Sequence, residues 1–117
     1  MARILVIDDE KSIRDLYQQA LEKAGYEVVA AENGQVGIDL HRDQRADLII
    51  TDIMMPQKDG FETIKELQEH FSGVKIIAIT GVGLHNLPVA FDLGAVRVFE
   101  KPVPLSDIIE TVRELVA

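Results

Sequence analysis

Short apolar runs alternate along this chain with segments of helical periodicity, and no other feature constrains the fold as strongly. The runs are predicted as strands at Arg3–Ile7, Glu27–Ala31, Leu48–Thr51, Lys75–Thr80 and Val96–Glu100. Strands that alternate with helices in this way favour a parallel sheet with right-handed crossovers and helices on both faces. We therefore expect one α/β domain with a doubly wound, five-stranded sheet, and we expect the strands, the last one included, to be buried.

The segments between the strands carry signals for helix starts and ends. In the first of them, apolar residues recur at helical spacing from Ile13 to Ala24, with Leu16 among them. Ser12 and Asp15 are spaced like a capping box, and Gly25 follows as a left-handed cap. The other helices are predicted at about 34–44, 60–71, 86–93 and 105–116.

Composition excludes several classes of function. The 117 residues are 47% hydrophobic, which suffices for the core of one domain. Twelve basic residues against 20 acidic ones give a net charge of −8, which argues against direct binding to nucleic acid. The absence of cysteine excludes disulfides and thiol chemistry. Because neither a membrane span nor a signal-peptide profile is visible, we expect a cytoplasmic protein.

Polar residues stand where the predicted strands end. Asp8 and Asp9 follow the first strand, Asp52 the third, Thr80 closes the fourth and Lys101 follows the fifth. Ligands of open parallel sheets bind outside the carboxyl ends of the strands, and in the strand order 2-1-3-4-5 the aspartates flank the switch point. Such carboxylates repel one another unless a cation joins them, and Mg²⁺ prefers oxygen ligands. The lysine and the threonine could then contact a phosphoryl group that a carboxylate attacks.

The three histidines carry no such pattern. His41, His70 and His85 lie far apart in the sequence and lack the spacing of metal ligands. We therefore expect them on the surface.

The polar residues at the strand ends carry a resemblance to a known family. The pattern occurs in order over nearly the whole chain and reads Asp8-Asp9-Glu10, Asp52-Ile-Met-Met55-Pro56-Gln-Lys-Asp59-Gly60, Thr80 and Lys101-Pro102. Together these pieces resemble the receiver domain of two-component response regulators, which is similar to the chemotaxis Y protein. The resemblance implies a flavodoxin-like (βα)5 fold with strand order 2-1-3-4-5 and one receiver domain at 1–117 with no output domain.

The resemblance also implies a role for each acid. Asp52 matches the aspartate that accepts a phosphoryl group, and it also belongs to the metal site. Asp9 matches a direct Mg²⁺ ligand, and Asp8 matches an acid that usually holds the metal through water. The backbone carbonyl of Met54 matches the third protein ligand.

For the switch region, the resemblance implies that the Thr80 hydroxyl moves toward the phosphoryl group and that Lys101 pairs with it. The Lys101-Pro102 peptide matches one that is usually cis. Receivers often place Tyr or Phe three residues before the lysine, where this chain has Val98. Phe99 is expected on the opposite face of its strand and so does not replace that ring. The chain therefore matches the pattern at the phosphorylation site and departs from it at Val98.

The function implied is a signalling switch and not an enzyme with a separate substrate. A sensor histidine kinase or a phosphotransfer protein would phosphorylate Asp52, and catalysis would be confined to that aspartate. Phosphorylation would change the face formed by 86–93, 96–100 and 105–116, which a downstream protein partner reads. That face would also form any weak dimer of the otherwise monomeric protein. No direct binding to nucleic acid or membrane is expected, and both a stand-alone protein and one domain of a larger regulator fit the sequence.

The alternative is a Mg²⁺-dependent phosphatase or phosphotransferase that acts on a separate substrate through an aspartyl phosphate. Haloacid-dehalogenase-like phosphatases place a second acid two residues after the nucleophile, where this chain has Met54. They usually carry a cap domain as well, for which 117 residues leave no room. A degenerate receiver that only binds partners is disfavoured, because all five functional positions are filled. Taken singly, Asp8 and Asp9 could merely cap a helix and Lys101 could be a surface lysine.

Overall fold

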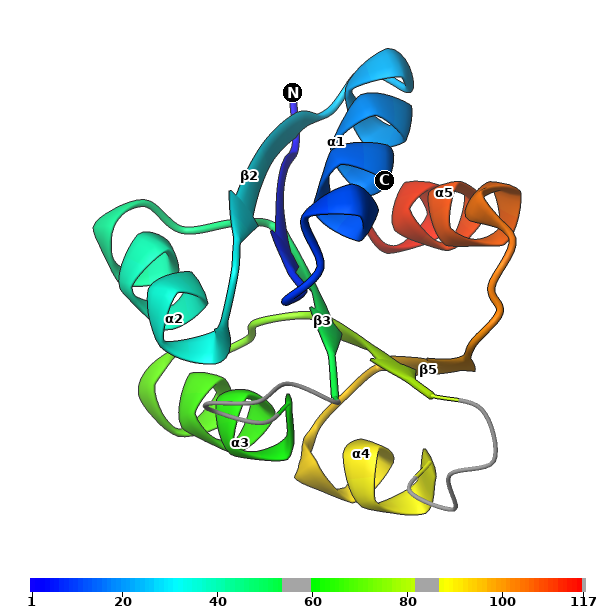
Figure 1. Cartoon of the computed structure of the whole chain (residues 1–117). Helices are drawn as coiled ribbons and strands as arrows, with labels where there is room; N and C mark the ends of the chain where they lie inside the picture. Colours follow the sequence, from blue (N-terminus) through cyan, green and yellow to red (C-terminus); the bar gives the residue numbers. More distant parts are fainter. Residues whose placement is uncertain (54–59, 82–86, 117) are drawn as a thin grey trace.

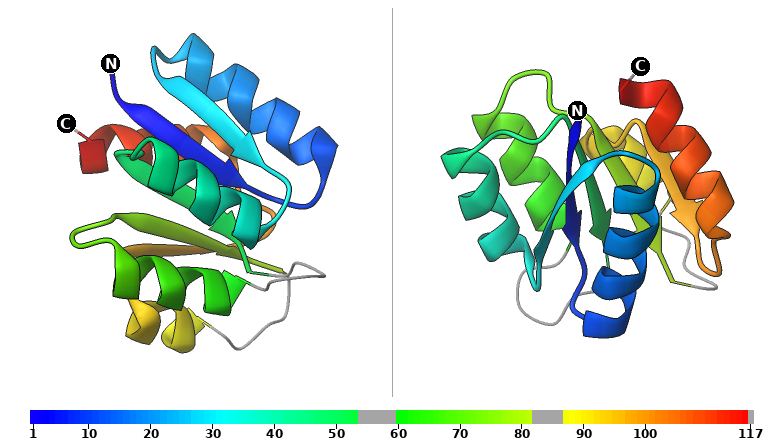
Figure 2. Two further views of the ribbon diagram at one scale, coloured as in Figure 1. Left: turned by 90° about the vertical axis from the view of Figure 1, so that its left-hand side faces the viewer. Right: turned by 90° about the horizontal axis from the view of Figure 1, so that it is seen from above.

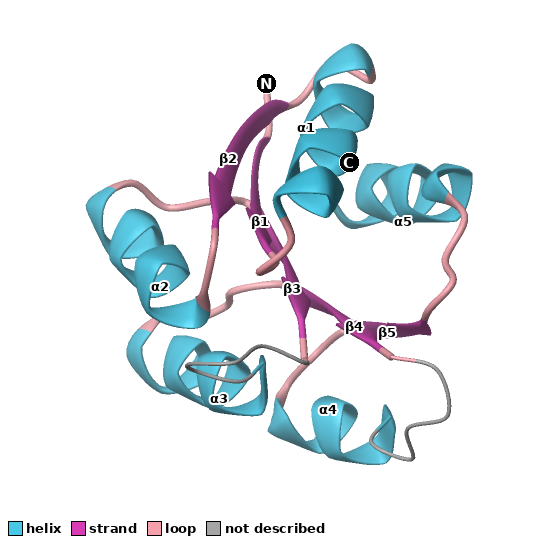
Figure 3. Cartoon of the chain, in the orientation of Figure 1, coloured by secondary structure: helices cyan, strands magenta, loops and turns pink. Residues whose placement is uncertain are grey.

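A parallel sheet with the strand order β2-β1-β3-β4-β5 forms the centre of the computed structural model, which describes residues 1–53, 60–81 and 87–116 (Figures 1 and 3). The strands are β1 (Arg3–Ile7), β2 (Glu27–Ala31), β3 (Leu48–Asp52), β4 (Ile76–Thr80) and β5 (Arg97–Glu100). The helices are α1 (Lys11–Lys23), α2 (Gly34–Asp43), α3 (Gly60–His70), α4 (Leu87–Leu93) and α5 (Leu105–Val116). The predicted fold class and strand order are confirmed.

Helices cover both faces of the sheet, so the core has two layers (Figure 2). On one face α1 and α5 pack through Leu21 and Ile108, and on the other α2, α3 and α4 pack through residues such as Ile38 and Leu67. Successive residues of a strand point to opposite faces, and the central strand β3 is buried at all five positions. This double cover explains why the central strands are continuous apolar runs.

Strand β5 is less buried than predicted. It begins at Arg97, and both Arg97 and Glu100 are exposed while Val98 and Phe99 are half-buried. The reason is its place at the edge of the sheet, where the neighbouring helices cover it incompletely. Val98 packs on the side of α2, α3 and α4, whereas Phe99 packs on the side of α1 and α5. Phe99 thus lies on the opposite face from Val98, as strand alternation predicts.

Helix α1 differs from its prediction at two points. It begins at Lys11, its N-cap is Glu10, and no side chain caps it, so the capping box of Ser12 and Asp15 does not form. Leu16 is 46% exposed and lies outside the core stripe. The predicted end is confirmed, because Gly25 follows the helix with φ of 102°.

His41 is buried, with only 2% of its surface exposed, and the prediction of a surface position is wrong for this residue. Its ring packs edge to face on Phe71 at 4.7 Å between centroids, and its Nδ1 accepts a hydrogen bond from the Ala46 N–H at 3.0 Å. The partner ring, Phe71, is distant in the sequence, so the residues near His41 give no sign that this histidine is buried. His70 is exposed as expected, and His85 lies outside the described residues.

Burial, together with the nearby charge of Arg45, lowers the pKa of His41 below its ordinary value of 6.5. Protonation would also break the bond from Ala46, because Nδ1 must keep its lone pair. Since the folded state resists protonation, the contribution of His41 to stability is complete above pH 6.5 and declines as the pH falls below it. We expect an NMR titration, with the resonance assigned through His41→Gln, to place the midpoint below 6.5. A midpoint at or above 6.5 would contradict this.

Candidate functional site

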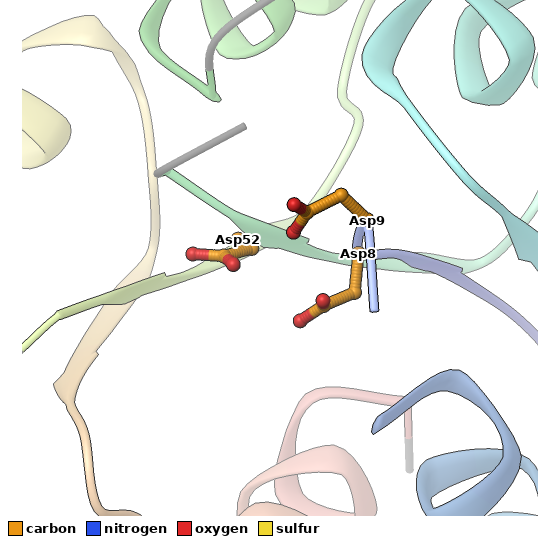
Figure 4. Close-up of side chains that lie close together, drawn as sticks. All are labelled: Asp8, Asp9 and Asp52. Carbon is orange, nitrogen blue, oxygen red and sulfur yellow. The ribbon is translucent and has the colours of Figure 1, made fainter. Parts of the chain in front are cut away.

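Three acidic side chains meet at the carboxyl ends of neighbouring strands (Figure 4). Asp8 follows β1 directly, Asp9 comes next, and Asp52 is the last residue of β3. One carboxylate oxygen from each lies within 4.8 Å of the other two. Asp8 and Asp52 are 4% and 3% exposed, whereas Asp9 is open to solvent. The structure therefore brings together the three acids that the sequence pattern singles out.

The strand register explains why these acids meet. Ile7 pairs with Thr51 across β1 and β3, so the residue that follows each of them emerges at the same edge. Hydrogen bonds hold Asp8 there: its N–H donates to the Ala31 carbonyl at 3.1 Å, and its Oδ1 accepts from the Glu10 N–H at 2.9 Å. The acid cluster is thus a direct consequence of the parallel pairing.

Lys101 and Thr80 reach the same edge from the other half of the sheet. The Lys101 Nζ lies 3.2 Å from the Asp52 Oδ2, and the Lys101 N–H donates to the Thr80 carbonyl at 2.8 Å. The Lys101-Pro102 peptide is cis, the geometry that the family resemblance implies. Thr80 is fully buried, and within the described part of the chain its Oγ1 has no hydrogen-bond partner.

Burial and neighbouring charges shift the pKa values of Asp8 and Lys101. Burial raises the pKa of Asp8 from 3.8 to about 6; the hydrogen bond from Glu10 opposes this shift and the charge of Asp52 adds to it. Burial by itself would lower the pKa of Lys101, but the charge of Asp52 and the hydrogen bond to it outweigh that effect, so the pKa is raised. A buried acid that ionises reluctantly beside two others is a site that a cation would stabilise.

The acid cluster fits a small divalent cation. Mg²⁺ binds six oxygens at about 2.0–2.1 Å, which places ligand oxygens about 3 to 4 Å from one another. Carboxylate oxygens within 4.8 Å of one another meet that requirement after small rotations, or with water between acid and metal. The predicted backbone ligand Met54 lies outside the described residues. Among the described residues, Asp8, Asp9 and Asp52 form a group that could hold the ion.

Two hydrogen bonds and one electrostatic interaction at the site were not predicted from the sequence. The Arg14 Nη1 donates to the Asp8 carbonyl at 2.8 Å, and the Gly60 N–H donates to the carbonyl of Ile53, the neighbour of Asp52. Tyr17, which lies in the apolar stripe predicted from Ile13 to Ala24, is 7% exposed, and its pKa is raised to about 12 by burial and then by the charges of two acids of the site. A cation early in a helix that starts beside two aspartates is the signal that could have identified Arg14.

Comparison with known proteins decides the family. A sequence profile of the response regulator receiver domain matches residues 4–113. The chain belongs to the response regulator receiver family. This receiver is 31% identical over 113 residues to sporulation initiation phosphotransferase F of Bacillus subtilis, covering 96% of this chain and 91% of that protein. It is 32% identical over 116 residues to the transcriptional regulatory protein CpxR of Escherichia coli, covering 98% of this chain and 49% of CpxR.

Solved structures agree with this assignment. A receiver domain from Clostridium thermocellum superposes with a TM-score of 0.93 at 31% identity, covering 99% of this receiver and 94% of that chain. The response regulator TrrA of Thermotoga maritima, in complex with Mg²⁺-BeF, gives a TM-score of 0.89 at 34% identity. The match covers 98% of this receiver and 99% of that chain. The resemblance inferred from the sequence is confirmed, and the phosphatase alternative is not favoured.

The receiver spans nearly all of the sporulation phosphotransferase but about half the length of CpxR and of the MprA regulators that it also matches. Among the helices of the described residues, none has the length and apolarity needed to cross a membrane.

Proposed function

We propose that this receiver accepts a phosphoryl group on Asp52 from a histidine kinase or a phosphotransfer protein, with Mg²⁺ bound by Asp8, Asp9 and Asp52. One observation carries the proposal: Asp52 lies between two further carboxylates and the ammonium group of Lys101, 3.2 Å away. That arrangement offers a nucleophile, a cation site and a second positive charge in one place. The bound Mg²⁺-BeF of the similar regulator TrrA supports the same reading.

The residues of the site divide the chemistry between them. An Asp52 carboxylate oxygen would form the new bond to phosphorus while the bond from phosphorus to the imidazole nitrogen of the donor breaks and the electron pair leaves with that nitrogen. Mg²⁺ supplies charge neutralisation for the phosphoryl oxygens. Lys101, which now pairs with Asp52, can exchange that partner for a phosphoryl oxygen. The buried Thr80 hydroxyl can donate to another oxygen.

The output would be a change in partner binding at the face built from α4, β5 and α5. Two large apolar side chains of α4 are exposed, Val89 at 45% and Phe91 at 51%, which suits a protein-binding surface. Thr80 and Lys101 connect the site to β4 and to the end of β5, so a change in their partners acts directly on the strand of that face. The downstream partner is a protein, and the face is also where a weak dimer would form.

A small phosphodonor tests the proposal without a kinase. With acetyl phosphate and Mg²⁺, intact-mass spectrometry is expected to show one phosphoryl adduct on the wild-type protein. No adduct should form in EDTA or on Asp52→Asn, because the first lacks the cation and the second lacks the nucleophile.

A matched control separates Asp52 from the other buried polar residues. Thr51→Ser changes the preceding, fully buried side chain and leaves the acids in place, so this variant should still be modified. An unchanged mass of the folded wild type, or equal adducts on Asp52→Asn, would refute the assignment.

A further inference from the structure

We propose that Arg14 is a positioning residue for the acid cluster, which sets the affinity for Mg²⁺ by fixing the peptide that joins Asp8 to Asp9. The inference rests on the proposed magnesium site and extends it to a side chain of α1. Arg14 is half-buried in the second turn of that helix, and its Nη1 donates to the Asp8 carbonyl at 2.8 Å.

The atom that Arg14 binds is the reason for this role. The carbonyl of Asp8 belongs to the planar peptide that links the two acids, so holding that oxygen restricts rotation of the whole unit. The direction of the Asp9 side chain depends on this peptide. Arg14 is also tied to the turn through its own backbone, since its N–H donates to the Glu10 carbonyl at 3.1 Å. Both ends of the residue therefore hold the turn that carries the acids.

Helix electrostatics alone do not account for the position of Arg14. A helix N-terminus favours acidic side chains, yet α1 has none in its first turn and carries Lys11 and Arg14 near its start. Lys11 pairs with Asp15 at 2.7 Å in solvent, whereas Arg14 turns inward to the backbone of Asp8. Burial is the largest cause of the raised pKa of Asp8, and the positive charge that opposes this rise comes from Lys101. We therefore infer that Arg14 acts through its hydrogen bond to the Asp8 carbonyl, which fixes the backbone there.

The sign of one measurement distinguishes positioning from charge. If Arg14 acted only as a nearby cation, its removal would relieve repulsion and tighten Mg²⁺ binding. If it positions the acids, its removal should weaken binding, as the loss of outer partners of metal ligands does, by about tenfold or more. Arg14→Met keeps much of the aliphatic stem and removes the donors, so it separates the two effects.

Amide NMR titration of the metal-free protein with MgCl₂ gives the Kd. Arg14→Met is expected to raise the Kd about tenfold. The control Lys11→Met, which removes a charge from the same end of α1, should leave it unchanged within about twofold or lower it, because only a solvent-exposed pair is lost. A folded Arg14→Met protein with an unchanged or lower Kd would overturn the proposal, including the case in which only its Tm falls.

The failure of this proposal can be separated from a failure of the magnesium site. Asp9→Asn in the same titration should abolish or strongly weaken binding whatever Arg14 does. Normal binding by the wild type, weak binding by Asp9→Asn and normal binding by Arg14→Met would overturn the role of Arg14 alone. A wild-type protein that binds no Mg²⁺ would overturn both.

Discussion

The Asp8→Asn variant is expected to be more stable than the wild type in metal-free buffer at pH 7.5. Burial raises the pKa of Asp8 from 3.8 to about 6, so the ionised group destabilises the folded state at this pH. At about 1.4 kcal/mol per pH unit, the relief amounts to about 2 to 3 kcal/mol, or about 5 to 10 °C in Tm. Asparagine keeps an oxygen that can accept the hydrogen bond from the Glu10 N–H.

The stability difference between Asp8→Asn and the wild type should depend on pH. Because the folded pKa of Asp8 is the higher one, the folded state binds the extra proton, and the penalty is absent below about pH 3.8 and complete above about pH 6. The advantage of Asp8→Asn should therefore shrink between pH 6 and pH 4. Comparing the two proteins cancels the opposite contribution of His41, which both retain.

Thermal unfolding in EDTA measures the stability of the two proteins without metal, and the same measurement in excess MgCl₂ shows how much each gains from binding. In Mg²⁺ the wild type should gain stability through binding, and Asp8→Asn should gain less. A variant that is less stable than the wild type at pH 7.5 without metal would mean that ionised Asp8 supports the fold.

Gly60→Ala is expected to damage both the fold and the site. A Cβ at this position would lie 2.5 Å from the Asp52 carbonyl oxygen and would also overlap the Cα of Ile53. Both obstacles are backbone atoms, which cannot rotate away as a side chain can. The start of α3 or the end of β3 must therefore shift, at a cost of about 3 kcal/mol. Because Asp52 ends β3, we also expect slower phosphorylation.

Gly73→Ala is the matched control for this substitution. Gly73 follows α3 with φ of 75°, and a Cβ there meets no atom within 4 Å. Its cost is only that of placing alanine in the left-handed region, about 1 kcal/mol. Urea unfolding and the rate of adduct formation compare the two variants. The prediction is contradicted if Gly60→Ala costs no more stability than Gly73→Ala and is phosphorylated at the wild-type rate. The close approach of Gly60 to the Asp52 backbone would then affect neither stability nor phosphorylation.

Periodic features of the sequence predicted most of the fold. Alternating strands and helices predicted a parallel sheet covered on both faces, and the family resemblance supplied its strand order. Residues that directly follow strands could be placed at one edge, which located the acid cluster. Features that depend on distant packing were missed. The exposure of β5 follows from its edge position, and the burial of His41 depends on Phe71, a residue 30 positions away whose ring no local pattern assigns to it.

The roles of Arg14 and Gly60 were missed for a related reason. Each lies against a backbone carbonyl. The place of Arg14 near the start of a helix beside two aspartates indicates a contact with the acids, but it does not tell which carbonyl lies within reach. The predicted capping box failed at Ser12, because the helix begins earlier: Glu10 is the N-cap residue, and its N–H is bonded to the Asp8 carboxylate. Side-chain chemistry at the site was thus predictable, whereas its backbone support required the structure.

Mapping the phosphorylated residue tests the central claim most directly. Borohydride reduces an aspartyl phosphate to homoserine, so peptide mass spectrometry after treatment with acetyl phosphate and Mg²⁺ identifies the modified position. Asp52 is predicted to be the converted residue, because it alone combines burial in the acid cluster with the contact to Lys101 in the described part of the chain. Conversion at Asp8 or Asp9 with Asp52 intact, or no conversion in the folded protein, would contradict the account.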